Sequence, residues 1–183
     1  MELIKEIKQT RILKSIFIAL IGTIILAISA KIKIPFFPVP MTMQTFVVLF
    51  IGITLGWKLG IATVSLYLLE GIIGLPVFSG TPEKGLGLVY FTGPTMGYLV
   101  GFLFSVFFAG FFKFDKNILK NFFKLIFSVS PIYILGIMWL GIAIGWDKPL
   151  IQLGVHPFLL AELFKILLLL VVLSKINKIK KYI

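Results

Sequence analysis

The sequence has no cysteine, only one histidine and few acidic side chains. Without cysteine, the chain offers no disulfide, no thiolate nucleophile and no zinc-thiolate site. The single histidine, His156, has no neighbouring acid or thiol in a metal-binding pattern, and we interpret it as structural. The chain also lacks a nucleophile-elbow motif, a phosphate-binding glycine loop and a His-Glu-x-x-His pair. These absences argue against an enzyme and predict that no metal or cofactor is bound.

Charged side chains are also scarce, at 14% of 183 residues, whereas hydrophobic residues make up 59% and the mean hydropathy is +1.09. A single soluble core cannot cover that much apolar surface. Uncharged runs such as Gly85 to Phe112 and Leu125 to Trp146 are long enough to cross a hydrocarbon core as helices. A transmembrane β-barrel would instead show short segments of alternating polarity. The composition therefore predicts an all-α protein embedded in a lipid bilayer.

We expect one membrane domain over residues 1–183, with six transmembrane helices. Six apolar segments define the spans: about Ser15 to Ala30, Met41 to Trp57, Leu59 to Leu75, Gly93 to Phe112, Phe123 to Trp146 and Val155 to Ser174. The first segment follows basic residues, as the core of a signal peptide does. We interpret it as the first span because the hydrophobic pattern continues to the C-terminal end.

The basic residues divide unevenly between the two sides of this scheme. With the N-terminus inside, 13 of the 18 fall in cytoplasmic segments: Lys5, Lys8, Arg11, Lys14, Lys58, Lys113, Lys116, Lys120, Lys124, Lys175, Lys178, Lys180 and Lys181. The outer segments hold Lys31, Lys33, Lys84 and Lys148. The positive-inside rule therefore predicts a plasma membrane protein with both termini in the cytoplasm. The net charge of +11 follows from this topology and from attraction to anionic lipids, and does not indicate nucleic acid.

Proline is concentrated in the outer connections, together with many glycines: Pro35, Pro38, Pro40, Pro76, Pro82, Pro94, Pro149 and Pro157. Irregular backbone at membrane depth is tolerated where it packs against protein or lines a cavity. We therefore expect structured outer loops that cover a ligand pocket.

Glu162 and Lys165 lie inside the sixth predicted span and share one helix face, because their spacing is i, i+3. Charged groups at this depth normally face the protein interior or a water-filled cavity. The two side chains form either a structural ion pair or the binding site of a polar, anionic solute, and both roles are compatible.

Other polar residues in or near the spans are less specific. Glu70, in the third span, is either a structural carboxylate or part of the pocket wall. Gln44, Thr42 and Thr45 stand at the outer start of the second span, where side chains can reach a ligand. Thr42 fits a helix cap equally well.

Small side chains recur every fourth residue on the first span, at Ser15, Ala19, Thr23 and Ala27. Such a strip lets another helix approach closely, and that helix belongs either to this chain or to another subunit.

Three motifs follow one another along the chain: Val39-Pro40-Met41-Thr42-Met43-Gln44-Thr45, then Gly74-Leu75-Pro76-Val77-Phe78, then Gly93-Pro94-Thr95-Met96-Gly97-Tyr98-Leu99. A fourth pattern, Pro157-Phe158 followed by Glu162 and Lys165, lies in the sixth span. Together, from about Thr10 to Lys175, the chain resembles the BioY family, the biotin-capturing S components of energy-coupling factor (ECF) transporters.

This resemblance implies high-affinity capture of biotin at the outer face, with a transmembrane coupling subunit and two ATPase subunits as partners. The small residues Ala19, Thr23 and Ala27 would then meet the coupling subunit. Glu162 would accept hydrogen bonds from the ureido N–H groups of biotin while Lys165 pairs with an oxygen of the ligand, and these two roles are exchangeable. The residues expected to bind the ligand are Glu162, Lys165, Gln44, Phe78, Ser79, Tyr90 and Tyr98.

The sequence departs from the family pattern in four places. Glu162 stands where aspartate is usual, Met96 where glycine is common and Thr23 where alanine is expected, and residues 79–84 replace a glycine-rich stretch. Two alternative functions stay open. One is an S component for another vitamin, such as riboflavin or thiamin, and the other is a self-sufficient secondary transporter, although inverted repeats are not evident. An intramembrane enzyme is disfavoured because nucleophiles and metal ligands are missing.

Overall fold

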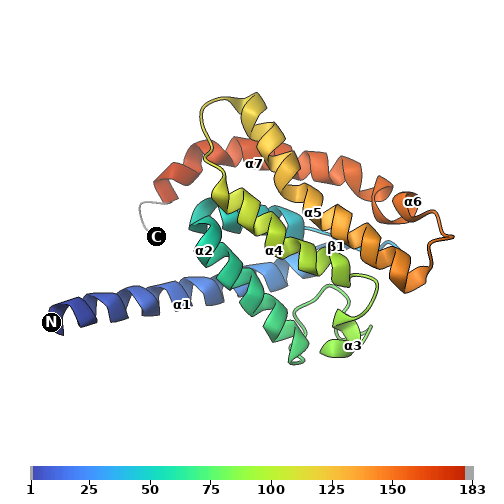
Figure 1. Ribbon diagram of the computed structural model, residues 1–183, viewed down its shortest axis with the longest axis horizontal. Helices are drawn as coiled ribbons and strands as arrows, with labels where there is room; N and C mark the ends of the chain where they lie inside the picture. The colour runs from blue at the N-terminus through green and yellow to red at the C-terminus, as the bar shows by residue number, and fades with distance from the viewer. Residues whose placement is uncertain (1, 180–183) are drawn as a thin grey trace.

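The computed structural model describes the backbone of residues 2–179 and the side chains of residues 12–173. The fold of this part is almost entirely helical (Figure 1): α1 Glu2–Lys31, β1 Lys33–Ile34, β2 Met41–Thr42, α2 Gln44–Ile72, α3 Leu88–Phe91, α4 Met96–Phe111, α5 Ile118–Ile144, α6 Leu150–Gly154 and α7 His156–Ile179. Seven of the basic residues assigned to the cytoplasmic side have side chains outside the described part of the chain: Lys5, Lys8, Arg11, Lys175, Lys178, Lys180 and Lys181.

α2 consists of two antiparallel helices that meet at Gly56. This residue has φ +75° and ψ 171°, a conformation outside the helical region that glycine adopts without a Cβ clash. The Gln44 amide donates a hydrogen bond to the Tyr67 hydroxyl at 2.7 Å across 23 residues, which a continuous helix would separate by about 35 Å. A Cβ on Gly60 would also lie 3.5 Å from the Cα of Gly52. With residues 44–55 and 57–72 counted separately, the described chain has the six long helices that the sequence predicts.

The long helices are apolar on their outward faces. Within the described residues, four helices have the length and composition to cross a membrane: Ile12–Lys31, Gln44–Ile72, Ile118–Ile144 and Leu150–Leu173. Met96–Phe111 is a shorter apolar helix. Large exposed side chains such as Ile134 on α5 and Phe164 on α7 would be unfavourable in water and suit lipid. The chain is therefore a multi-pass helical membrane protein.

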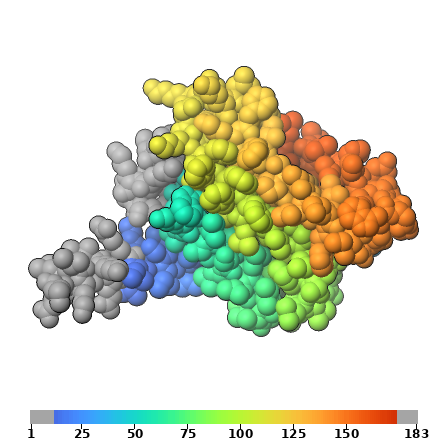
Figure 2. Space-filling view, viewed as in Figure 1, coloured from blue at the N-terminus to red at the C-terminus, as the bar shows by residue number. Residues whose placement is uncertain are grey.

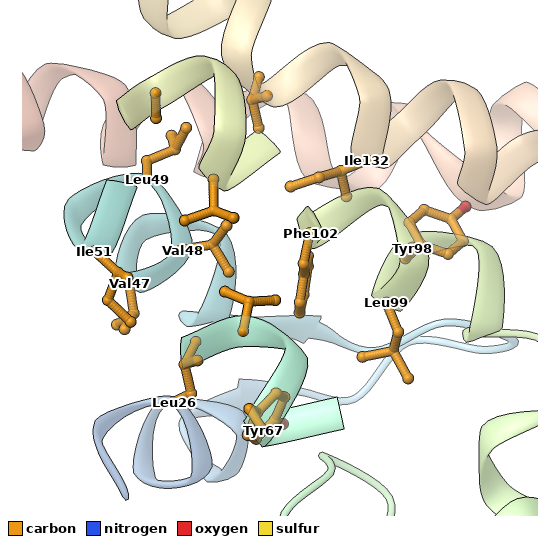
Figure 3. Packing of buried hydrophobic residues seen from close by; sticks show 14 of the residues in the cluster. Leu26, Val47, Val48, Leu49, Ile51, Tyr67, Tyr98, Leu99, Phe102 and Ile132 are labelled. Carbon is orange, nitrogen blue, oxygen red and sulfur yellow. The ribbon is translucent and has the colours of Figure 1, made fainter. Parts of the chain in front are cut away.

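α4 packs between α2 and α5, and Figure 2 shows it on the face toward the viewer between these two helices. Glycines bring the backbones close together, because a Cβ on Gly101 would lie 2.6 Å from the Cα of Ile132. Buried side chains of α1, α2, α4 and α5 contribute to one hydrophobic core, as Figure 3 shows for Leu26, Tyr67, Phe102 and Ile132.

The two ends of the bundle differ. The β1–β2 pair, α3 and α6 lie toward the right of Figure 1, and the beginning of α1 and the end of α7 lie at the left. At the left-hand end, the turn at Gly56 packs against Gly110, whose Cβ would lie 2.4 Å from the Trp57 nitrogen. Basic residues described toward this end include Lys14, Lys58, Lys113, Lys116, Lys120 and Lys124. Proline-rich connections and basic connections are thus on opposite sides of the helices.

Two features differ from the sequence-based expectation. α5 begins at Ile118 and not near Phe123, because the Asn117 side chain caps the helix by accepting a hydrogen bond from the Lys120 N–H at 3.0 Å. The proline-rich connections also contain regular structure. Lys33 pairs with Thr42 in the antiparallel β1–β2 hairpin, and α3 and α6 are short helices.

Candidate functional site

A cavity lies among α2, α4, α5 and α7, beside the β1–β2 hairpin. The space that it encloses is about 60 Å³, and the atom-free space is about 540 Å³ when the part open to solvent is included. Its polar lining consists of Thr42, Gln44, Thr45, Ser79, Tyr90, Thr95, Tyr98, Tyr133, Glu162 and Lys165. Its apolar lining consists of Val39, Pro40, Met41, Leu99, Phe102, Ile132 and Phe158.

Glu162 and Lys165 form a buried ion pair on the cavity wall. The Lys165 Nζ lies 3.5 Å from the Glu162 Oε1, and the two residues are only 6% and 4% exposed. The Lys165 ammonium also donates to the Thr42 carbonyl oxygen at 2.7 Å and to the Thr45 Oγ1 at 2.9 Å. The Thr45 hydroxyl in turn donates to the Glu162 Oε1 at 2.6 Å. The two charges therefore compensate each other, and β2 and α2 supply further polar partners through Thr42 and Thr45.

Tyr133 holds the second oxygen of the Glu162 carboxylate. Its hydroxyl donates to the Glu162 Oε2 at 2.5 Å from α5. Pro131 precedes it in the helix interior and has no N–H to donate, and the Ser130 hydroxyl donates to the Phe127 carbonyl oxygen at 2.9 Å in its place. The carboxylate is thus fixed between α2 and α5, a preorganised acceptor at the cavity wall.

Gln44 belongs to a second hydrogen-bonded chain. Its amide donates to the Tyr67 hydroxyl, which donates to the Val77 carbonyl oxygen at 3.0 Å, and its own oxygen accepts from the Thr42 hydroxyl at 3.2 Å. These contacts join the start of α2, its second half and the segment that follows it. Gln44 is therefore held in one orientation at the cavity wall.

The segment after α2 is attached to the end of α1 by two lysines. The Lys31 ammonium donates to the carbonyl oxygens of Phe78 and Thr81, both at 2.8 Å. The Lys33 ammonium donates to the Ser79 carbonyl oxygen at 2.7 Å. The Ser79 hydroxyl lies 3.1 Å from the Tyr90 hydroxyl. These contacts hold Ser79 and Tyr90 against the cavity.

Six of the seven residues predicted to bind a ligand line this one cavity: Glu162, Lys165, Gln44, Ser79, Tyr90 and Tyr98. Phe78 does not line it. Its side chain is fully buried behind the wall, stacked on the Tyr90 ring with centroids 5.3 Å apart. Among the described residues, Glu70 does not line the cavity and is half-buried near the end of α2. His156 is exposed at the start of α7.

Tyr133 is the main cavity residue that the sequence argument did not single out. The sequence feature that could have identified Tyr133 is a hydroxyl-bearing side chain in an apolar run, two residues after a proline inside a predicted span. Tyr98, which was predicted to bind the ligand, also donates a hydrogen bond from its hydroxyl to the Gly154 carbonyl oxygen at 3.0 Å.

The small residues of α1 are divided between the chain's own interior and an open groove. Thr23 is buried, its hydroxyl donates to the Leu20 carbonyl oxygen at 2.9 Å, and Ala27 is half-buried against the core. A Cβ on Gly22, the residue before Thr23, would lie 2.5 Å from the Thr63 side chain of α2. The groove between α1 and residues 57–72 is lined by Ile12, Ser15, Ile16, Ala19, Leu59, Ala62, Ser65, Leu66 and Leu69.

The fold and the cavity define a class: a multi-pass helical membrane protein with a cavity among its helices that contains a buried, hydrogen-bonded ion pair. Within that class the family is identified by sequence. The chain belongs to the BioY family, whose family model matches residues 4–182.

Curated relatives and a solved structure agree with this assignment. The chain is 34% identical over 153 residues to a probable biotin transporter BioY of Pyrococcus horikoshii, which covers 84% of this chain and 86% of the relative. It is 32% identical over 161 residues to the biotin transporter BioY of Thermotoga maritima, and this match covers 87% of this chain and 94% of the relative. Its fold matches a crystal structure of the S-component for biotin from an ECF-type ABC transporter, with a TM-score of 0.76 and 26% identity over 92% of this chain and 93% of the other.

Proposed function

We propose that this chain is a high-affinity biotin-binding S component, which captures biotin at the outer face of the plasma membrane for import by an ECF-type transporter. The observation that carries the proposal is the Glu162 carboxylate held by Thr45 and Tyr133 at the cavity wall. Biotin combines ureido N–H donors, an apolar bicycle and a carboxylate. The cavity offers a charged acceptor, an ammonium donor at Lys165 and aromatic walls that suit this combination.

The proposed orientation places the cavity toward the outside and both termini in the cytoplasm. The support is the positive-inside rule, applied to the basic connections at the end of the bundle away from the cavity. Residues 1–183 act as one membrane domain. No catalytic step and no cofactor is part of this function, because binding and release of the vitamin are enough.

Equilibrium binding to the detergent-purified chain tests the proposal. Biotin is expected to bind one per chain, and riboflavin and thiamin are not expected to compete with it. Saturable binding of another vitamin in place of biotin would assign the chain to a different substrate. Biotin uptake by proteoliposomes that contain this chain alone would instead identify a self-sufficient transporter.

The groove between α1 and residues 57–72 is the proposed contact with the transmembrane coupling subunit. Its small residues Ser15, Ala19, Ala62 and Ser65 allow a helix of another subunit to approach closely. Ala19 keeps the role that the resemblance implies, whereas Thr23 and Ala27 would contribute by shaping α1 against α2.

Replacing Ala62 with leucine is expected to lower ATP-dependent biotin uptake by the assembled transporter about tenfold, because the added bulk fills the groove. Ala62 is exposed, and biotin binding by the isolated chain is expected to stay unchanged. Ala143→Leu is the control, because it adds the same bulk to an exposed position on α5. Equal uptake by the Ala62 variant and the control would exclude the groove as the contact.

A further inference from the structure

A second cavity adjoins the first on the side of the proline-rich connections. The two share Pro40, Tyr90 and Thr95 as lining residues, which makes them neighbouring compartments with a common wall. The second cavity lies between the β1–β2 connection, at Pro38, and the segment that contains Lys84 and Val89. We call it the outer cavity and the first one the inner cavity.

The lining of the outer cavity is mostly apolar, with a cation at one side. Pro38, Pro40 and Val89 present rigid apolar surface. Lys84 is exposed, and its stem lies close to Gly80, whose Cβ would be 3.1 Å from the Lys84 Cδ. An apolar passage that ends at an ammonium is complementary to an alkyl chain that ends in a carboxylate.

The two cavities differ in how their positive charge is compensated. In the inner cavity the Lys165 ammonium has the Glu162 carboxylate at 3.5 Å and two oxygen acceptors, one from Thr42 in β2 and one from Thr45 in α2. A ligand carboxylate placed there would meet the like charge of Glu162.

Lys84 offers the contrasting case. Among the described residues its ammonium makes no ion pair or side-chain hydrogen bond, and the neighbouring Glu83 carboxylate lies 3.7 Å from the Lys33 ammonium. The uncompensated cation is therefore at the outer cavity.

We propose that the outer cavity is the carboxylate subsite of the ligand. The ureido ring occupies the inner cavity against Glu162, the aliphatic chain passes between Pro40 and Tyr90, and the carboxylate meets the Lys84 ammonium. This inference rests on the proposed function and settles the direction of the ligand, which the sequence left open. The outer wall then distinguishes an acid from its neutral derivatives.

Comparing biotin with biotinamide, its neutral amide, tests the subsite in Lys84→Met, a variant that keeps an apolar stem. The wild-type chain is expected to bind biotin about fivefold tighter than biotinamide, since the ion pair is partly exposed to water. Lys84→Met is expected to lose this preference by weakening biotin alone, and added salt is expected to reduce it in the wild type. Lys148→Met is the control, because it removes an exposed lysine from the α5–α6 connection, outside the outer cavity.

Three results would overturn the subsite. The first is equal affinity of the wild-type chain for biotin and biotinamide, and the second is an equal loss of affinity for both ligands in Lys84→Met. The third is a loss of affinity for biotin alone in Lys165→Met, which would mean that the ligand binds in the opposite orientation. Absence of biotin binding by the wild-type chain would contradict the proposed function itself, so the two failures are distinguishable.

Discussion

Replacing Glu162 with glutamine is expected to weaken biotin binding about hundredfold, since a charge-assisted acceptor of the ureido N–H groups is lost. The carboxylate accepts from Thr45 and Tyr133 in the structure, and an amide can accept through only one of its two terminal atoms. The substitution also leaves the Lys165 ammonium without its counter-ion. Equilibrium titration of the detergent-purified variant with biotin measures the effect.

Glu70→Gln is the matched control for that variant. It also neutralises a carboxylate in a helix, but Glu70 is not among the residues that line the inner cavity in the described part of the chain. Its biotin affinity is expected to equal that of the wild type. A Glu162→Gln variant with wild-type affinity, or an equal loss in both variants, would remove Glu162 from the binding site.

Lys165→Met is expected to destabilise the folded protein by about 3 to 5 kcal/mol, because it leaves the Glu162 carboxylate buried without a cation. For a chain of this length, that corresponds to a fall in Tm of roughly 10 °C, measurable by thermal unfolding in detergent. The double variant Glu162→Gln with Lys165→Met has no uncompensated charge. It is expected to regain most of the lost stability and still to bind biotin poorly.

Lys148→Met controls for the loss of an exposed ion pair. The Lys148 ammonium lies 3.0 Å from the Asp147 carboxylate, but both side chains are more than half exposed. Because exposed ion pairs contribute little to stability, the Tm of the Lys148→Met variant is expected to stay close to that of the wild type. A single Lys165→Met variant as stable as the double variant would show that the two buried charges do not compensate each other.

The helical architecture and the main charged pair could be predicted from the sequence because both depend on local properties. Uncharged runs of sufficient length can only be membrane helices, and an i, i+3 spacing places Glu162 and Lys165 on one helix face wherever that helix packs. The prolines likewise marked the connections that form the β1–β2 hairpin and the two short helices. Each of these inferences needs only a few neighbouring residues.

The rest of the site depends on contacts between distant segments. Thr45 is 117 residues from Glu162 in the chain, and Tyr133 is 29 residues from it, so only the packing of α2 and α5 against α7 brings them to the carboxylate. The position of Phe78 behind Tyr90 could not be predicted for the same reason, because an aromatic residue in a motif fits the lining and its support equally well. The Glu162 side chain reaches partners on two helices at once.

A structure of the biotin-bound protein tests the central claim most directly. The expected result is a ureido nitrogen of biotin within hydrogen-bond distance of the Glu162 carboxylate, with the ring between Tyr98 and Phe158. Biotin seated elsewhere, or a Glu162 carboxylate that stays bound only to Thr45 and Tyr133 while biotin is present, would contradict the account.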